Sequence, residues 1–413
     1  MKAILLLHVP ALLLLAANTV PTQSHGQPRQ RAAVRHHFRP SAIVQPVGPA
    51  KFGDPLPGLT QEQLADFTAG GMEFQADESI EGGLGPIFNG PSCVTCHASG
   101  GVGGGVTVTV TRFGRFVNGQ FDPLDMLGGS LLQQKAIDVG AIEIVPNEAT
   151  VIAHRNSTPV FGLGLIEAIS DRDIQRGVPR QPIDGINGRA ALVQYVVSGQ
   201  QRVGRFGWKA QQATILAFAG DAYLNEMGVT SRFVPTENAP NGNAAALGAF
   251  DNVADPEDEP DPLTGKGAID SAADFMRLLA PPPTVPLTPP AQAGRQIFQQ
   301  LNCTGCHTPS MTTGPSPIAA LHFKPVPLYS DLLLHDMGLL GDGIAQGAAG
   351  PREMRTAPLW GLRVSAPYLH DGRAATIDDA IRVHDGEAQN PRERYLRLSP
   401  TQQQAVVAFL NSI

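Results

Sequence analysis

The stretches Cys93-Val94-Thr95-Cys96-His97 and Cys303-Thr304-Gly305-Cys306-His307 share one pattern, two cysteines three positions apart followed at once by a histidine. Two thiols at i and i+3 lie on one face of a helical turn, where they can add across the two vinyl groups of a haem while the neighbouring imidazole reaches the iron. A zinc or thiol redox site also uses Cys-x-x-Cys, but the repeated histidine favours haem. All four cysteines of the chain lie in these motifs. We therefore expect two covalently bound haem c groups, with His97 and His307 as iron ligands.

Length and composition indicate a globular, loop-rich protein. The 413 residues, 42% of them hydrophobic, are enough for two or three packed domains. The formal charge is −7 and no long basic run occurs, which argues against nucleic acid or an anionic membrane surface as a partner. The 45 glycines and 36 prolines predict many turns and long irregular connections.

The N-terminus is typical of a signal peptide, which we place at 1–26. Met1 and Lys2 precede an apolar stretch at 3–17, which is shorter than the roughly 20 residues of a membrane-spanning helix. No second stretch of that kind follows, so we expect no integral membrane span and a periplasmic or secreted protein. The first part of the range 27–58 is basic and lacks any periodic pattern, and we therefore expect a disordered arm at 27–58.

The rest of the chain predicts a mainly α fold with a minor β-hairpin and two cytochrome c-like domains. These are an enlarged N-terminal domain at 59–235 and a C-terminal domain at 288–413, joined by an acidic, proline-rich linker with one helix at 236–287. Alternation at 106–111 predicts a strand that forms a hairpin with 115–117. Helical patterns occur at 192–198, 210–227, 271–279, 290–301, 377–384 and 401–413.

Several longer segments carry a resemblance to a known family. They are Gly83-Leu84-Gly85-Pro86-Ile87-Phe88-Asn89, Gly162-Leu163-Gly164-Leu165-Ile166-Glu167-Ala168-Ile169, Arg205-Phe206-Gly207-Trp208-Lys209-Ala210, Tyr329-Ser330-Asp331-Leu332-Leu333-Leu334-His335-Asp336-Met337-Gly338, Arg355-Thr356-Ala357-Pro358-Leu359-Trp360-Gly361-Leu362 and Pro367-Tyr368-Leu369-His370-Asp371-Gly372-Arg373. Over about 59–413 the chain resembles the bacterial di-haem oxidoreductases, which are related to the di-haem cytochrome c peroxidases. The resemblance implies a peroxidase-type oxidoreductase that takes hydrogen peroxide or another small oxidant. Its electrons would come from a small donor protein such as a monohaem cytochrome.

The resemblance also implies a second ligand for the C-terminal haem. In the related peroxidases a ligand follows the Pro-Tyr-aromatic-His-Asp/Ser-Gly segment by a fixed interval and is usually Met. His384 occupies that position here. An iron held by His307 and His384 would have a lower potential than a His/Met iron. His335 and Met337 are the alternative ligands.

Three further histidine and tryptophan residues resemble functional positions of the family. His370 resembles a histidine near the haem edge and the inter-haem region, and Trp208 resembles a tryptophan between the two haems. A structural histidine and a core tryptophan are the simpler interpretations. His154 resembles a removable ligand of the N-terminal haem, but it stands directly against Arg155 instead of several residues before it, so a solvent-facing role stays open.

Glu226 resembles the acid/base glutamate of the related peroxidases. Peroxide cleavage needs such a group because a proton must move from one oxygen to the other as the bond breaks. An exposed carboxylate at a helix end is the alternative. The family's preceding glutamine is missing here, unless Gln211 or Gln212 substitutes for it.

Three functions are compatible with these features. The favoured one is peroxide reduction at the N-terminal haem, with electrons entering through the C-terminal haem by way of Trp208. The second is oxidation of an organic or protein substrate, as in the related maturation enzyme for methylamine dehydrogenase. The third is a plain electron-transfer cytochrome, which would not need so large an N-terminal domain. The spin state of the N-terminal iron separates both enzymes from the carrier.

Overall fold

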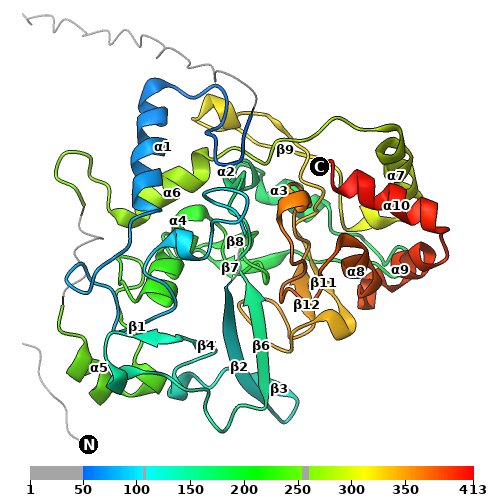
Figure 1. The fold of residues 1–413 in the computed structure, drawn as a ribbon. Helices are drawn as coiled ribbons and strands as arrows, with labels where there is room; N and C mark the ends of the chain where they lie inside the picture. The colour runs from blue at the N-terminus through cyan, green and yellow to red at the C-terminus, as the bar shows by residue number, and fades with distance from the viewer. Residues whose placement is uncertain (1–49, 106–107, 254–259) are drawn as a thin grey trace, which may run out of the picture. The chain divides into compact units, whose positions relative to one another are not determined.

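Helices and short strands alternate along the chain and are joined by long connections (Figure 1). The computed structural model describes residues 50–105, 108–253 and 260–413. The predicted signal peptide and most of the predicted arm lie outside these residues. Within them, no helix is both long enough and apolar enough to cross a bilayer.

Helix predominates over strand, as expected. The α-helices are α1 Gln61–Glu73, α2 Leu163–Glu167, α3 Asp171–Arg176, α4 Ile215–Ala222, α5 Ala244–Phe250, α6 Ala268–Leu278, α7 Pro289–Gln300, α8 Ile377–Arg382, α9 Gln389–Leu396 and α10 Pro400–Leu410. A π-helix, Tyr223–Met227, continues α4. Five of the six predicted helical segments contain a helix, but 192–198 does not, because Ala191–Gln194 is a strand whose residues alternate between buried and exposed.

The strands form small sheets. They are β1 Ile87–Phe88, β2 Thr109–Val117, β3 Gln120–Asp122, β4 Leu131–Leu132, β5 Lys135–Ala136, β6 Val151–Asn156, β7 Ala191–Gln194, β8 Gln201–Gly204, β9 Met311–Thr312, β10 Pro325–Val326, β11 Leu334–Asp336 and β12 Glu353–Arg355. The largest sheet has four strands, in which β2 pairs with β3, β4 and β6. The predicted hairpin is misplaced, because 115–117 belongs to β2 itself and the return strand is β3.

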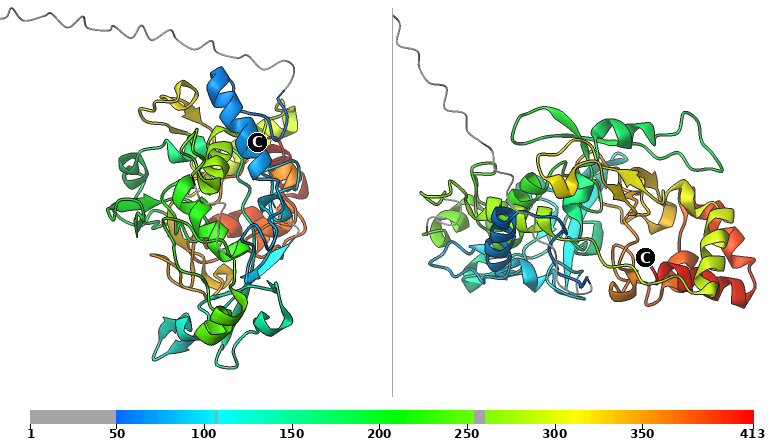
Figure 2. Two further views of the ribbon diagram at one scale, coloured as in Figure 1. Left: turned by 90° about the vertical axis from the view of Figure 1, so that its left-hand side faces the viewer. Right: turned by 90° about the horizontal axis from the view of Figure 1, so that it is seen from above.

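Two helix pairs, α1 with α6 and α7 with α10, depend on close backbone approach. A Cβ at Gly70 of α1 would lie 2.2 Å from the Ser271 carbonyl oxygen, and one at Gly294 of α7 would lie 1.8 Å from that of Ala405. Only glycine permits such contacts. Figure 1 shows α7 and α10 side by side, and the right-hand view of Figure 2 shows them together again.

Each cysteine motif adjoins its own hydrophobic cluster. The larger cluster includes residues from Leu56 to Trp360, and Cys93 packs against it. The smaller one extends from Ala291 to Ile413, and Cys303 packs against it. The division into two cytochrome c-like domains stays a prediction, but each motif does have a core beside it.

Two predicted irregular segments contribute to the larger core. In the described part of the arm, the Leu56 amide donates to the Leu278 carbonyl over 2.7 Å, and Leu56 is buried. The described residues of the predicted linker form two α-helices, α5 and α6, where one was expected, and α6 buries seven of its eleven residues. Apolar side chains at helical spacing on α6 outweigh the prolines and acidic residues around it.

Candidate functional site

Both Cys-x-x-Cys-His motifs fold into the same short turn. Cys93–Thr95 and Cys303–Gly305 are single 3₁₀ turns, and in each motif the histidine amide donates to the first cysteine's carbonyl over 2.9 Å. All four cysteines are unpaired. The local hydrogen bonds therefore hold two thiols and an imidazole together on one turn.

The thiols of both motifs lie in a desolvated environment. Burial raises the pKa of Cys93 and of Cys303 to about 12, and that of Cys96 to about 11. In each motif the two thiols and the histidine lie on one turn, which is the arrangement expected of a haem attachment site.

The two motif histidines are neutral, as iron ligands must be. Burial lowers the pKa of His97 to about 4. Burial and then the neighbouring His384 lower the pKa of His307 to about 4. His307 Nδ1 lies 3.0 Å from the Tyr329 carbonyl oxygen, so Nδ1 carries the proton and Nε2 keeps its lone pair for a metal.

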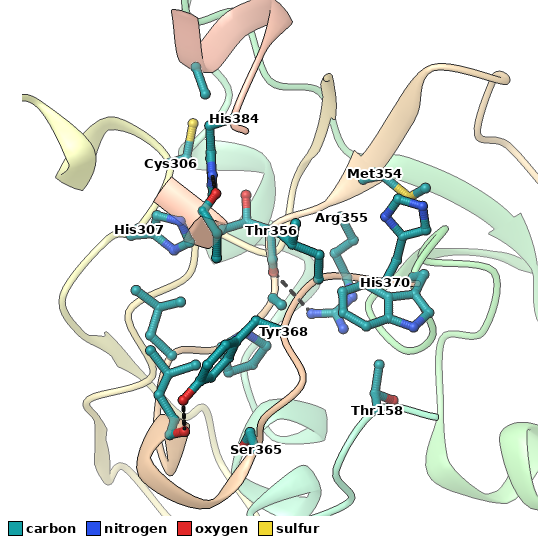
Figure 3. A pocket seen from close by; sticks show the side chains of 18 of the residues that line it. Thr158, Cys306, His307, Met354, Arg355, Thr356, Ser365, Tyr368, His370 and His384 are labelled. Carbon is teal, nitrogen blue, oxygen red and sulfur yellow. Dashed lines mark hydrogen bonds between the residues drawn. The ribbon is translucent and has the colours of Figure 1, made fainter. Parts of the chain in front are cut away.

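His384 faces the same cavity as His307. The cavity has a volume of about 280 Å³, and both histidines line it. Figure 3 shows them close to Cys306. His384 Nδ1 lies 2.7 Å from the Ala380 carbonyl oxygen, which again leaves Nε2 free, and burial lowers the pKa of His384. The two imidazoles therefore line one cavity, and His384 is a second nitrogen donor there that could bind the same metal as His307.

His335, one alternative ligand, is fully occupied. Its Nε2 lies 2.9 Å from Asp331 Oδ2 and its Nδ1 lies 2.7 Å from Glu387 Oε2. Burial opposes its charge, but hydrogen bonds to Asp331, Cys306 and Glu387 raise its pKa to about 12. An imidazolium with both N–H groups donated has no lone pair for iron. Met337, the other alternative, lines the cavity.

Trp208 and His370 meet in the wall of the same cavity. Their ring centroids lie 6.2 Å apart in an edge-to-face arrangement. Trp208 Nε1 donates to the Asn156 carbonyl over 2.7 Å, and the Asn156 amide donates to the His370 carbonyl over 2.6 Å. Burial lowers the pKa of His370 to about 4, although Asp371 and Asp342 oppose the shift. Asn156 thus ties together two of the predicted site residues.

A buried ion cluster holds the segments on which these residues lie. Asp342 accepts from Arg155 Nε over 2.7 Å and lies 3.0 Å from Lys209 Nζ, and all three side chains are at most 5% exposed. Arg155 directly precedes Asn156, and Lys209 directly follows Trp208. The cluster therefore fixes the residue next to each partner of the hydrogen bond between the Trp208 indole and the Asn156 carbonyl.

Replacing Asp342 with asparagine should lower the free energy of unfolding by about 3–5 kcal/mol, because two buried cations lose their counter-ion. Chemical denaturation of the purified protein measures this. The matched control is Asp173→Asn, which removes an exposed ion pair with Arg176 and should cost about 0–1 kcal/mol. Equal losses in the two variants would contradict the role of the buried cluster.

Glu226 lies in the π-helix Tyr223–Met227 and is joined to the segment that leads into the first motif. Its side chain accepts from Asn89 Nδ2 over 2.9 Å, and its carbonyl accepts from the amides of Asn89 and Gly90. Burial and then the charge of Glu226 raise the pKa of Cys96. Burial raises the pKa of Glu226 itself, with Arg112 and Asn89 opposing the shift. The structure thus places a desolvated carboxyl group beside the first haem motif.

Two charged groups near Glu226 were not anticipated from the sequence. Burial lowers the pKa of Arg112 to about 10, with Arg155 acting in the same direction and Glu226 and Asp221 opposing. Burial raises the pKa of Asp221, which accepts a hydrogen bond from Gln212. Arg112 lies in an alternating strand, where an arginine ordinarily faces solvent, so no pattern indicated its position. Gln212 binds Asp221, and the Gln211 side chain lies against Gly207.

His154 is placed apart from these groups. It is exposed on β6, and its Nδ1 lies 3.3 Å from Thr111 Oγ1 on β2. Side chains alternate along a strand, so Arg155 and His154 point to opposite faces, and it is Arg155 that is buried.

Residues 143–413 match the family described as "Di-haem oxidoreductase, putative peroxidase". The match covers more than half of the chain, and the chain therefore belongs to this family. The matched range includes the second motif and His384 and begins after the first motif. No curated protein matches the chain.

Solved structures show a weaker likeness. Hydrazine synthase from Kuenenia stuttgartiensis is 16% identical over 94% of this chain and 100% of that one, with a TM-score of 0.40. The diheme peroxidase BthA from Burkholderia thailandensis is 15% identical over 90% of this chain and 94% of that one, also with a TM-score of 0.40. A MauG-like protein associated with microbial copper homeostasis is 16% identical over 61% of this chain and 88% of that one, with a TM-score of 0.31. At TM-scores this low, the likeness does not assign a role to any residue of this chain.

Proposed function

We propose that this family member is an exported di-haem c-type oxidoreductase that reduces hydrogen peroxide at its N-terminal haem. Electrons would enter from a small donor protein, such as a monohaem cytochrome, through the C-terminal haem. The observation that carries the proposal is the position of Glu226, a desolvated carboxyl group tied to Asn89 beside the first motif. A plain electron carrier needs no such group.

In this proposal the residues around each haem have separate tasks. A haem held by Cys93, Cys96 and His97 would supply the redox chemistry for cleaving the peroxide bond. Glu226 takes the proton from the near oxygen and returns it to the far one. Asn89 holds the Glu226 carboxyl group in place, and Arg112 stabilises the negative charge that develops on the far oxygen before it leaves as water. His154, exposed on β6, has no task here.

The second haem would be held by Cys303, Cys306, His307 and His384. The edge-to-face contact of Trp208 with His370 lies in the cavity wall, which supports Trp208 as the group between the haems. The Asn156 carbonyl, which accepts from the indole, keeps the ring in one orientation.

Covalent attachment is tested by denaturation. The protein is expected to retain two haems per chain after unfolding and extraction with acidified organic solvent, because thioether bonds survive both treatments. Quantitative haemochrome spectra measure the content, and Cys303→Ala is expected to weaken the attachment of one haem only. Complete extraction of haem from the parent would contradict the proposal.

The reaction is tested with purified, haem-loaded protein. Hydrogen peroxide should be consumed with two equivalents of a reduced monohaem cytochrome per peroxide, and the N-terminal iron should contain a high-spin fraction in the oxidised or half-reduced protein. If both irons stay low-spin and no peroxide is consumed, the protein is an electron carrier.

Oxidation of an organic or protein substrate is the second candidate. The observation that favours it is His384, whose free Nε2 faces the His307 cavity, because a bis-histidine iron has a low potential. Substrate-dependent loss of peroxide without a cytochrome donor would support this function over the first.

A further inference from the structure

The cavity lined by His307 and His384 has positively charged side chains in its wall but no negatively charged ones. Its lining includes three arginines, Arg205, Arg355 and Arg392, and no aspartate or glutamate. Most of the other lining side chains are apolar. A cavity with this wall fits an apolar ligand that carries negative charge at one edge.

Two of these arginines already have a carboxylate partner. Arg205 pairs with Asp171, and Arg392 lies 3.4 Å from Asp385. Arg355 differs from both. It is 6% exposed, and in the described part of the chain it makes no ion pair. The aspartate whose charge acts on Arg355 is Asp331, but the Asp331 oxygens accept from the Leu333 amide and bind His335.

The position of Arg355 is fixed by backbone groups. Its Nε donates to the Gly207 carbonyl over 2.8 Å and its Nη1 to the Thr356 carbonyl over 3.1 Å. Its own amide donates to the Trp208 carbonyl over 2.8 Å. Nη2 makes no hydrogen bond to any residue that the structure describes. Figure 3 shows the guanidinium between Thr356 and His370, so a preoriented donor group faces the cavity.

A buried guanidinium without a counter-ion is costly, and a carboxylate matches its planar donors. We propose that Arg355 binds a propionate carboxylate of the haem attached at Cys303 and Cys306. A haem meets the requirements of the cavity, since its ring is apolar and its carboxylates lie at one edge. The inference rests on the second haem site proposed above and not on the reaction catalysed.

The test compares Arg355→Met and Arg355→Lys with the control Arg352→Met, all as haem-loaded protein. Arg352 lies three residues earlier, is exposed and pairs with Asp336. The readouts are the propionate bending bands in resonance Raman spectra and the reduction potentials of both haems. Neither measures turnover.

Arg355→Met should shift the propionate bands and lower the potential of one haem, because loss of a nearby cation favours oxidised iron. A tenfold change in the redox equilibrium, about 59 mV for one electron, is the expected size. Arg355→Lys should restore most of the potential but not the bands, because it keeps the charge without the planar donor pair. The control should match the parent. If Arg355→Met does not fold, the propionate bands of Arg355→Lys test the proposal instead, since they should differ from those of the parent.

Parental bands and potentials in both Arg355 variants would overturn the proposal. The proposal would also be overturned if added acetate changed the propionate bands of the parent, since Arg355 would then be open to free carboxylates. Failure of the haem site itself is recognised separately, as fewer than two haems retained by the denatured parent.

Discussion

Replacing Glu226 with glutamine should lower peroxide turnover by about 10²–10⁴-fold, the usual contribution of a positioned acid/base group. Glutamine keeps the shape of the side chain and can still bond to Asn89, but it cannot carry the proton between the two oxygens. Haem content and reducibility should therefore stay at the parental level. Stopped-flow spectra after peroxide addition measure the step directly.

The control is Glu81→Gln, which alters an exposed carboxylate in the segment before the same motif. Its effect on stability should stay within about ±0.5 kcal/mol, with turnover unchanged. Parental rates of peroxide reaction in Glu226→Gln would remove the acid/base role from Glu226. Arg112 and Gln212, which lie in the same charged cluster, would then be the next residues to replace.

Replacing His384 with methionine should raise the potential of one haem by on the order of 100 mV, within the roughly 0.8 V that axial ligands span. Thioether sulfur favours the reduced metal more than imidazole does. The other haem should change little. A redox titration followed at the absorption bands of both haems measures the effect.

His322→Met serves as the control, because His322 is exposed and bonds to Ser316. An unchanged titration and an unchanged low-spin spectrum in His384→Met would show that His384 is not a ligand. The role would then pass to Met337, since both nitrogens of His335 are bonded to carboxylates.

The sequence predicted the features that depend on local patterns. The apolar pattern located most of the helices, as at α10, where the predicted range 401–413 overlaps the observed helix Pro400–Leu410. Both cysteine motifs could be located because their chemistry lies within five consecutive residues. The segment 192–198 was misjudged because its short runs of apolar residues, at 192–193 and 196–197, suit a strand as well as a helix.

The surroundings of the motifs could not be predicted, because they depend on residues far apart in the chain. Arg112 and Glu226 come from β2 and the π-helix, more than a hundred positions apart. Arg355 was part of a family segment, but only the three-dimensional structure shows that none of the carboxylates among the described residues pairs with it. The exposed position of His154 follows from the register of β6, which the sequence alone left open.

The Asp342 cluster has a consequence for how the protein could be divided. Its two cations come from Arg155 and Lys209, in the part of the chain predicted to form one domain, while the anion comes from the part predicted to form another. A fragment that ends before Asp342 would keep both cations without the carboxylate that neutralises them. The two halves that carry the cysteine motifs are therefore poor candidates for separate expression or for exchange with halves of other proteins, unless Asp342 and its two cations are transferred together.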